Sequence, residues 1–342
     1  MCLNPGDILH ERYQIIDELG CGGFATTYRA RDLDIPDDRL CVVKEIQPPS
    51  SQDPAVLQMA HERFEREART LLLLGEHDRI PRLLDCFQEC TCSQERENFY
   101  LILEYIEGHP LSEELVSNTR WTEEQVIEFL QDILPVIKVV HQNNVIHRDI
   151  KPSNLIRRSC DNKIVLIDFG AVKEISTLDN PQLERTKTVN IGTSGYMAPE
   201  QFHGCPEFCS DIYSIGIICI QALTGLPPQD FLQYIQNNIW RSIPDRPLVK
   251  VSNRLTAILN KMVFYDFNKR YKDVAKILHD LKARNPWIWL GTIGIIAGCA
   301  IAIFGHKILT PKTCSLVQGD SLSCGEESLL QYSTPRLKQR GI

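Results

Sequence analysis

The sequence predicts an α+β fold with two lobes, a small sheet-rich lobe and a larger helical lobe, followed by one transmembrane helix. Short apolar runs bounded by glycines fill the first hundred residues, and helical spacing of apolar residues takes over after Gly108. Residues 285–305 then contain no charged side chain. A length of 342 residues, with 43% hydrophobic and 24% charged residues, suits two domains or one large two-lobed unit.

The small lobe is predicted from short strands that surround one helix. Residues 13–32 contain two apolar runs around glycines, which is a hairpin pattern. Residues 55–76 carry apolar side chains at spacings of three and four, so we expect a helix that ends near Gly75. Further strands are predicted at 40–47, 82–89 and 98–106.

The larger lobe is predicted to be helical. Thr122 is a suitable N-cap because acidic residues follow it, and Gly225 is a suitable stop for a buried helix. The sequence between the lobes contains no long linker, so we expect a cleft where they meet. Helices are predicted within 122–144, 211–225, 251–263 and 271–283.

The uncharged segment near the C-terminus predicts a single membrane span at residues 287–305. About 18 mostly apolar residues at ~1.5 Å each match a hydrocarbon core of about 30 Å, and Trp287 and Trp289 stand at one end, as interfacial aromatic residues do. A buried core helix is the weaker alternative, because residues 306–342 offer little to build a core around it. Lys and Arg are more numerous before the span than after it, which predicts a cytoplasmic N-terminal part and a short extracytoplasmic tail.

Composition also bears on other classes of function. A net charge of −7 without a basic block disfavours nucleic acid as a partner, and the N-terminus lacks a signal-peptide pattern. Among 13 irregularly spaced cysteines, Cys86, Cys90 and Cys92 cluster; we interpret them as reduced thiols, with a metal or redox role as the alternative. Cys314 and Cys324 in the tail are candidates for a disulfide.

Two features of the small lobe suit phosphate binding. Gly20 and Gly22 lie in a strand–turn–strand context, where glycine lets backbone amides approach phosphate oxygens, although hairpins also use glycine routinely. Lys44 ends the strand pattern "CVVK"; it is either a sheet-edge lysine or an ammonium that Glu67, on the following helix, holds toward phosphates by an ion pair. A P-loop does not fit, because no GK[ST] occurs and a strand follows the glycines.

The stretch "VIHRDIKPSNLI", residues 145–156, is polar between apolar flanks. It is either a solvated turn or the place where a proton is taken from a substrate hydroxyl. Asp149 is followed by Asn154, and Asp168 stands in "IDFG" after an apolar strand. A carboxylate beside a hydroxyl can accept its proton, and the oxygen ligands Asn154 and Asp168 suit the Mg²⁺ that phosphoryl transfer needs. The order and spacing of these residues favour the second interpretation.

Together these motifs resemble those of the eukaryotic-type (Hanks-type) Ser/Thr protein kinases over residues 11–282. The amino-acid sequences of the motifs look most like those of bacterial, cyanobacterial-like, single-pass membrane members. "LGCGGFATTY" matches the glycine-rich loop, "HRDIKPSN" the catalytic loop, and "DFG" and "APE" (Ala198–Glu200) the later signatures. The resemblance implies an N-lobe at 11–103 and a C-lobe at 104–282, after a lead at 1–10. It also implies a non-specific serine/threonine protein kinase of membrane-linked signal transduction, which uses ATP and Mg²⁺ to phosphorylate protein substrates.

The resemblance implies a role for each matching residue. Asp149 would be the catalytic base, Lys151 would steady the transferred phosphoryl group, and Asn154 and Asp168 would bind Mg²⁺. Thr193 in "GTSGYMAPE" would belong to the substrate platform, and together with Lys151 it resembles the Ser/Thr-specific branch. The implied nucleotide site, with Glu67 paired to Lys44 and Leu103 as gatekeeper, comprises Leu19, Gly20, Cys21, Gly22, Gly23, Phe24, Ala25, Thr27, Val42, Lys44, Glu104, Ile106 and Ile156.

Three positions depart from the family pattern. Ala25 replaces the third glycine of the loop, where alanine costs about 1 kcal/mol if φ is positive. Thr27 stands where valine usually packs on adenine, and Val42 stands where alanine usually does. These departures leave an ATP-binding pseudokinase scaffold as the alternative, but no charged or metal-binding residue is missing, which favours the active kinase. A small-molecule phosphotransferase is a further rival, but it has no need of the "GTSGYMAPE" platform.

The resemblance also implies structural anchors and regulation. Asp211 and Arg270 resemble the family's anchors, and Arg270 is expected to pair with Glu200. Arg148 offers a basic group to a phosphorylated activation loop, about residues 168–200. We predict autophosphorylation there at Thr186 and Thr188, with polar loop residues as the alternative. Gly294 and Gly298 are typical of a helix-pairing face, which makes a homodimer one alternative to ordinary glycine usage in a span.

Overall fold

The computed structural model describes residues 3–22, 25–35, 39–46, 54–91, 96–174, 193–244 and 247–282. Several predicted features lie outside the described residues: Gly23, Phe24, Thr186, Thr188, Gly294, Gly298, Cys314, Cys324 and the expected span at 287–305.

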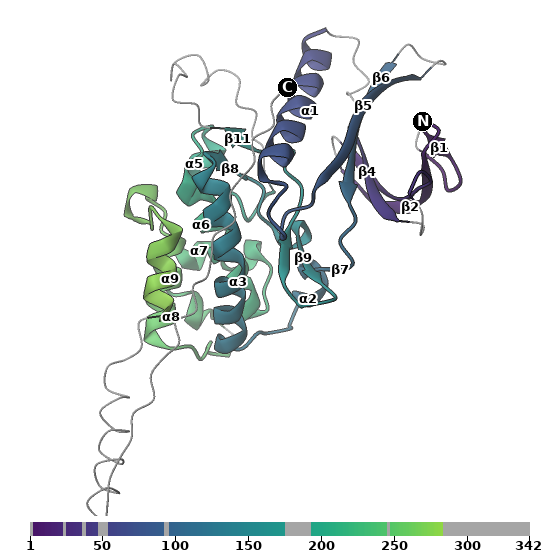
Figure 1. The fold of residues 1–342 in the computed structure, drawn as a ribbon. Coiled ribbons are helices and arrows are strands. Elements are labelled where there is room, and N and C mark those ends of the chain that lie inside the picture. Colours follow the sequence, from purple (N-terminus) through teal and green to yellow (C-terminus); the bar gives the residue numbers. More distant parts are fainter. Residues whose placement is uncertain are drawn as a thin grey trace, which may run out of the picture. The chain divides into compact units, whose positions relative to one another are not determined.

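A six-stranded antiparallel sheet builds the small lobe (Figure 1). One strand was not predicted: β1 is two residues long and pairs with β2 through Ile8 opposite Gln14, so part of the expected N-terminal lead belongs to this sheet. In spatial order the strands are β1 (Ile8–Leu9), β2 (Tyr13–Cys21), β3 (Ala25–Asp32), β4 (Leu40–Ile46), β6 (Arg96–Glu104) and β5 (Leu83–Thr91).

The predicted helix of the small lobe is α1 (Pro54–Leu74), which packs against β5 and β6 (Figure 1). Its buried side chains recur every three or four residues, from Phe64 through Glu67 to Leu71, so that one face meets the sheet. The helix ends before Gly75, where a Cβ would lie 2.6 Å from the Leu71 carbonyl oxygen. Glycine is therefore required for the chain to turn away at this point.

Alternation along β4 separates the two faces of the sheet. Lys44 points to the face that carries α1, whereas Cys41 and Val43 join a second buried cluster with Tyr13 and Tyr28. Phe87 packs on this second cluster and stacks on the ring of His10 with centroids 4.4 Å apart. Residues before β2 thus cover the sheet face that α1 leaves open.

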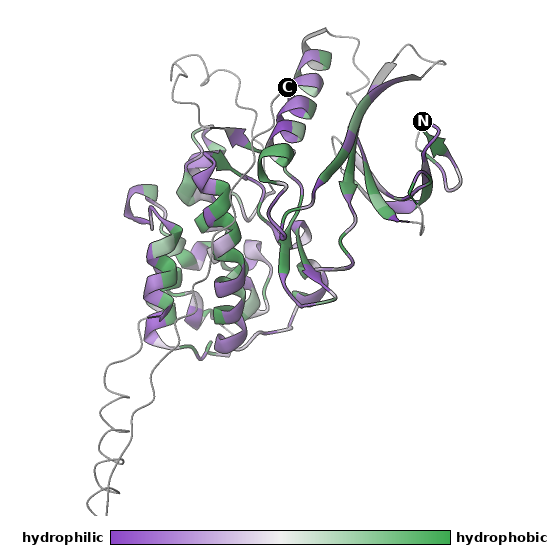
Figure 2. Cartoon of the chain, in the orientation of Figure 1, coloured by the Kyte–Doolittle hydropathy of each residue, from purple (hydrophilic) through white to green (hydrophobic). Residues whose placement is uncertain are grey.

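Helices dominate the larger lobe (Figure 1). The Thr122 side chain accepts a hydrogen bond from the Gln125 amide, which begins α3, and Gly225 ends α6 with φ 67°. α6 is buried on all sides, because every residue from Cys209 to Thr224 except Gln221 is buried. Figure 2 shows hydrophobic and hydrophilic residues side by side along the helices of this lobe, and α6 accordingly buries polar residues such as Asp211 among its apolar ones. The helices are α2 (Leu111–Glu114), α3 (Glu123–Gln142), α5 (Pro199–Phe202), α6 (Phe208–Thr224), α7 (Pro228–Ile235), α8 (Asn253–Met262) and α9 (Val274–Lys282).

Two small sheets frame the stretch quoted above; of their strands, the sequence predicted only the apolar one that precedes Asp168. β9 (Leu155–Arg158) lies between β7 (Gly108–Pro110) and β10 (Ile164–Leu166), and β8 (Val145–Ile146) pairs with β11 (Lys173–Glu174). Residues 147–154 connect β8 to β9, and we call them the catalytic loop. Both ends of this loop are therefore fixed by strands.

Among the described residues, no single helix has the length and apolar character needed to cross a membrane. α6 and α7 meet that test only as a pair, across a bend of 110°, and α6 is buried within the larger lobe.

Candidate active site

The glycine-rich hairpin is formed by the ends of β2 and β3. Gly20 pairs with Thr27, whose hydroxyl donates to the Gly20 carbonyl at 3.1 Å. The Gly22 amide donates to the Ala25 carbonyl at 2.8 Å, which joins the ends of the two strands. Leu19 and Cys21 are exposed on this hairpin. The end of β2 is thus open to solvent.

Lys44 on β4 reaches two carboxylates at once. Its Nζ lies 2.6 Å from Glu67 Oε1 on α1 and 2.7 Å from Asp168 Oδ1. The side chains of Lys44 and Glu67 are only 9% and 3% exposed, so water screens their ion pair little. Burial by itself would lower the pKa of Lys44, but the charges of Asp168 and Glu67 outweigh it and raise that pKa. Lys44 therefore remains a cation at neutral pH.

Asp149 in the catalytic loop is surrounded by donors. Thr193 donates its hydroxyl hydrogen to Asp149 Oδ1 at 2.8 Å, and Lys151 Nζ lies 2.8 Å from Asp149 Oδ2. Lys151 also donates to the Thr193 hydroxyl at 2.9 Å, which closes a ring of three contacts. The Thr193 hydroxyl therefore points its hydrogen at a carboxylate that can accept a proton.

Asn154 and Asp168 lie close together beside Asp149. Asn154 Nδ2 donates to the Asp149 carbonyl at 2.9 Å and lies 3.5 Å from Asp168 Oδ2. Asp168 adopts φ 66°, which turns its carboxylate toward Lys44 and Asn154. Partial burial would raise the pKa of Asp168, but Lys44 holds it well below its usual value, so the carboxylate stays ionised.

This oxygen-rich set fits Mg²⁺. The ion prefers hard oxygen ligands and is held by one or two carboxylates together with substrate phosphates, rather than by an all-protein cage. Asp168 Oδ2 and the amide oxygen of Asn154 supply such ligands. In the part of the chain that the structure describes, no group of three or more His, Cys, Asp or Glu side chains could hold a metal without such phosphates.

The start of the catalytic loop is bound by a residue of α6. Asp211, with a 1% exposed side chain, accepts hydrogen bonds from the amides of His147 and Arg148, each at 2.9 Å. His141 Nε2 lies 2.8 Å from Asp211 Oδ2, and this contact outweighs burial and lowers the pKa of Asp211. Sequence reasoning missed His141, although its position in the last turn of a helix before the loop is a usable signal.

The remaining nucleotide-site residues lie along the junction of the lobes. Val42 on β4 pairs with Leu103 on β6, and Ile106 follows β6 while Ile156 lies on β9; all four side chains are half-buried. Glu104 differs from the rest because its carboxylate contacts Arg82 at 3.2 Å. Only the backbone of Glu104 is therefore left for a nucleotide base.

Glu200 and Arg270 form the ion pair that was expected of them. The two side chains meet at 2.7 and 2.8 Å and are almost fully buried. Ser210 adds a hydrogen bond of 2.5 Å to Glu200. This pair fixes α5, and with it the segment that carries Thr193.

Two lysines, two aspartates and an asparagine arranged beside a glycine hairpin define a phosphoryl-transferring site. Residues 13–282 match the protein kinase domain, and the chain belongs to the protein kinase family, whose members use ATP and Mg²⁺.

Several cyanobacterial proteins are similar to this chain. Serine/threonine-protein kinase B of Synechocystis sp. is 41% identical over 280 residues, which is 80% of this chain and 47% of that protein. Serine/threonine-protein kinase C of the same organism is 39% identical over 82% of this chain and 51% of its own length. Serine/threonine-protein kinase PknA of Nostoc sp. is 38% identical over 80% and 48%. The chain thus spans about half the length of the curated relatives it matches.

Proposed function

We propose that this chain is a serine/threonine protein kinase that transfers the γ-phosphoryl group of ATP to protein hydroxyls. The carrying observation is the contact between Thr193 and Asp149, which presents a hydroxyl to a carboxylate at 2.8 Å beside the Lys44–Asp168 pair. A substrate hydroxyl beside that of Thr193 would donate to the same carboxylate, because an ionised carboxylate accepts several hydrogen bonds. The relatives named serine/threonine-protein kinases support this activity.

Each residue has a step to perform in this reaction. Asp149 accepts the proton of the substrate hydroxyl, and Lys151 places a positive charge beside the oxygen that is attacking. Lys44, held by Glu67, binds phosphate oxygens, and the glycine hairpin covers them with backbone amides. Asn154 and Asp168 would hold Mg²⁺, which neutralises charge that develops on the phosphates.

A cavity that follows Thr193 in the chain favours a polypeptide over a small molecule as the acceptor. It has a volume of about 460 Å³ and begins at Ser194, one residue after Thr193. Met197, Phe202 and Tyr265 give it an apolar lining, and Phe202 is 60% exposed. A side chain near the acceptor in a protein substrate would fill such a space, whereas a small phosphate acceptor would leave it empty.

We propose in addition that the protein is anchored in the inner (plasma) membrane by one span at residues 287–305, with the kinase domain in the cytoplasm. The support is the run of uncharged, mostly apolar residues between a Lys/Arg-rich segment and the tail. A homodimer through Gly294 and Gly298 belongs to the same proposal. Membrane extraction by detergent but not by alkaline carbonate would test the span.

Regulation through the activation loop is also a proposal. Arg148 lies beside Asp149 and is 5% exposed, so a phosphate on Thr186 or Thr188 that reached it would pair with a positive charge in the active site. Mass spectrometry of the purified chain after incubation with ATP would find phosphate at these two residues. An active enzyme with neither residue modified contradicts this proposal.

The activity is tested with the full chain in detergent, labelled ATP, Mg²⁺ and a protein substrate. Wild type should label Ser and Thr, and Asp149→Asn should lose the label while still binding ATP. Lys44→Ala should lose label and bind ATP more weakly. If wild type binds ATP but labels nothing, the chain is a pseudokinase scaffold.

A further inference from the structure

The loop that joins α1 to β5, residues 75–82, is fastened to the larger lobe by charged side chains. Arg79 Nη1 donates to the backbone oxygen of Asp132 at 2.7 Å and to its Oδ1 at 2.8 Å. The amide of Leu166 on β10 donates to the Arg79 carbonyl at 3.1 Å. Arg79 is therefore bound to α3 by its side chain and to β10 by its backbone.

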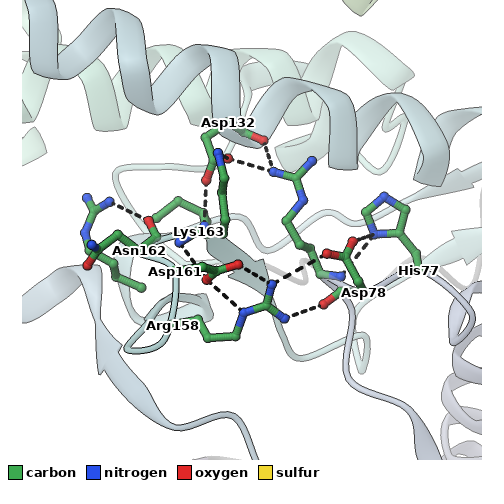
Figure 3. Close-up of polar contacts among 10 residues, drawn as sticks. His77, Asp78, Asp132, Arg158, Asp161, Asn162 and Lys163 are labelled. Carbon is green, nitrogen blue, oxygen red and sulfur yellow. Dashed lines mark hydrogen bonds and ion pairs between the residues drawn. The ribbon is translucent and has the colours of Figure 1, made fainter.

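A second arginine, which belongs to the larger lobe, binds the same loop. Arg158, at the end of β9, donates to the backbone oxygen of Asp78 at 2.8 Å and lies 3.5 Å from its carboxylate. Asp161 holds the other edge of this guanidinium at 2.7 and 3.0 Å, and Figure 3 shows Arg158 between Asp161 and Asp78. The arginine is thereby oriented before it reaches the loop.

Asp132, at the top of Figure 3, receives several contacts in this arrangement. Besides Arg79, its carboxylate accepts the Ile164 amide at 2.6 Å and lies 3.3 Å from Lys163. The side chains of Arg79 and Asp132 are 14% and 13% exposed, so their ion pair is less screened than a surface pair. We call Asp78, Arg79, Asp132 and Arg158 the loop anchor.

The loop anchor acts on the end of the helix that carries Glu67. Leu71, Leu74 and Ile80 are each 2% exposed and belong to the core that continues into the larger lobe. Glu67 lies seven residues before the end of α1, about 10 Å away at ~1.5 Å per residue, so a tilt of about 6° at that end would move it by about 1 Å. A shift of that size at a catalytic contact costs on the order of 100-fold in rate.

We propose that the loop anchor consists of positioning residues, which hold α1 so that Glu67 meets Lys44 and Lys44 meets Asp168. The larger lobe, rather than the sheet alone, then sets the distance between Glu67 and Lys44. This inference rests on the proposed kinase activity and adds a structural requirement to it.

The test uses the full chain and the variants Arg79→Met and Arg79→Lys. Arg79→Met removes both bonds to Asp132 but keeps the apolar stem, and it should lower kcat/KM by about 10- to 100-fold. Arg79→Lys keeps the charge and should restore most of the loss. Arg254→Met is the matched control, because Arg254 also donates to a backbone oxygen, that of Asp280 at 2.9 Å, but lies on α8.

A double-mutant cycle with Glu67→Gln distinguishes an effect of the anchor through Glu67 from a general loss of structure. If the anchor acts through Glu67, Arg79→Met should change kcat/KM by no more than about twofold in the Glu67→Gln background. An equal loss in both backgrounds, or an equal loss in Arg254→Met, overturns the proposal. Arg158→Met repeats the cycle should Arg79→Met fail to fold.

Hydrogen exchange gives a readout that does not need activity. Amides of residues 62–74 should exchange faster in Arg79→Met and Arg158→Met than in wild type. In Arg254→Met their exchange rates should equal those of wild type. Unchanged exchange in both anchor variants overturns the proposal. If wild type transfers no phosphoryl group, the proposed activity has failed, and this measurement still decides whether the anchor holds α1.

Discussion

The Thr193 hydroxyl donates to Asp149 Oδ1 at 2.8 Å, although 44 residues separate the two in the chain. Lys151 contacts both partners, so the hydroxyl, the carboxylate and the ammonium form one unit. In the proposed reaction, this contact would couple the place where a substrate binds to the carboxylate that takes its proton.

The first prediction concerns this contact. Thr193→Val keeps the shape of the side chain but removes its hydrogen bonds to Asp149 and Lys151, whereas Thr193→Ser keeps them. A hydrogen bond to a charged group contributes about 1.5–3 kcal/mol, so we expect kcat/KM for a protein substrate to fall about 10- to 100-fold in the valine variant. Steady-state kinetics check this. Equal activity of the valine and serine variants contradicts it.

The second prediction concerns stability. Arg270→Met leaves the Glu200 carboxylate buried without its partner, which should lower the free energy of unfolding by about 3–5 kcal/mol. The double variant Arg270→Met with Glu200→Gln removes the charge that was left behind, so it should be more stable than the single variant. Urea unfolding followed by fluorescence measures both. A double variant that is less stable than Arg270→Met argues against a buried-charge penalty.

The third prediction follows from the lowered pKa of Asp211. A carboxyl group with a lower pKa in the folded state adds stability above its unfolded pKa, near 3.8, and loses it as the pH falls further. Asp211→Asn should therefore be less stable than wild type at pH 7, by about 1.5–3 kcal/mol for hydrogen bonds to a charged group. The difference should shrink as the pH is lowered below about 4. Urea midpoints at several pH values test this, and a constant difference contradicts it.

The sequence predicted the parts of the fold that depend on local patterns. The helices that begin after Thr122 and end at Gly225 follow from a capping residue and a glycine with positive φ. The strand with Lys44 and the helix with Glu67 follow from apolar periodicity. β10 was predicted as the apolar run before Asp168, but β1, β7, β8, β9 and β11 were missed because strands of two to four residues are too short for any periodicity to show.

Contacts between distant segments could not be predicted in the same way. Arg79 and Asp132 are 53 residues apart, and Arg158 and the Asp78 carbonyl are 80 apart, without a motif that links them. The motif residues could be predicted as one candidate site because their order in the chain is itself a pattern. The loop anchor depends on how a loop and two other elements meet, which becomes visible only in three dimensions.

The last prediction concerns the cavity beside Thr193. Its lining by Met197, Phe202 and Tyr265 is apolar, so a substrate with a large apolar side chain close to the acceptor should bury that side chain there. Burying such a side chain contributes about 1.5–3 kcal/mol, so replacing it by alanine should lower kcat/KM by about 10- to 100-fold. Peptides that carry leucine at each position around one serine would locate the preferred position.

The matched protein variant is Phe202→Ser, which removes an exposed ring without touching Asp149 or Lys151. With this variant the leucine and alanine peptides should be phosphorylated at nearly equal rates, because the apolar wall is gone, while a peptide that lacks the leucine should react as with wild type. If Phe202→Ser slows both peptides equally, the ring supports the active site itself. If it slows neither, the substrate chain passes elsewhere, because a side chain bound in this cavity would lose its contacts with the Phe202 ring.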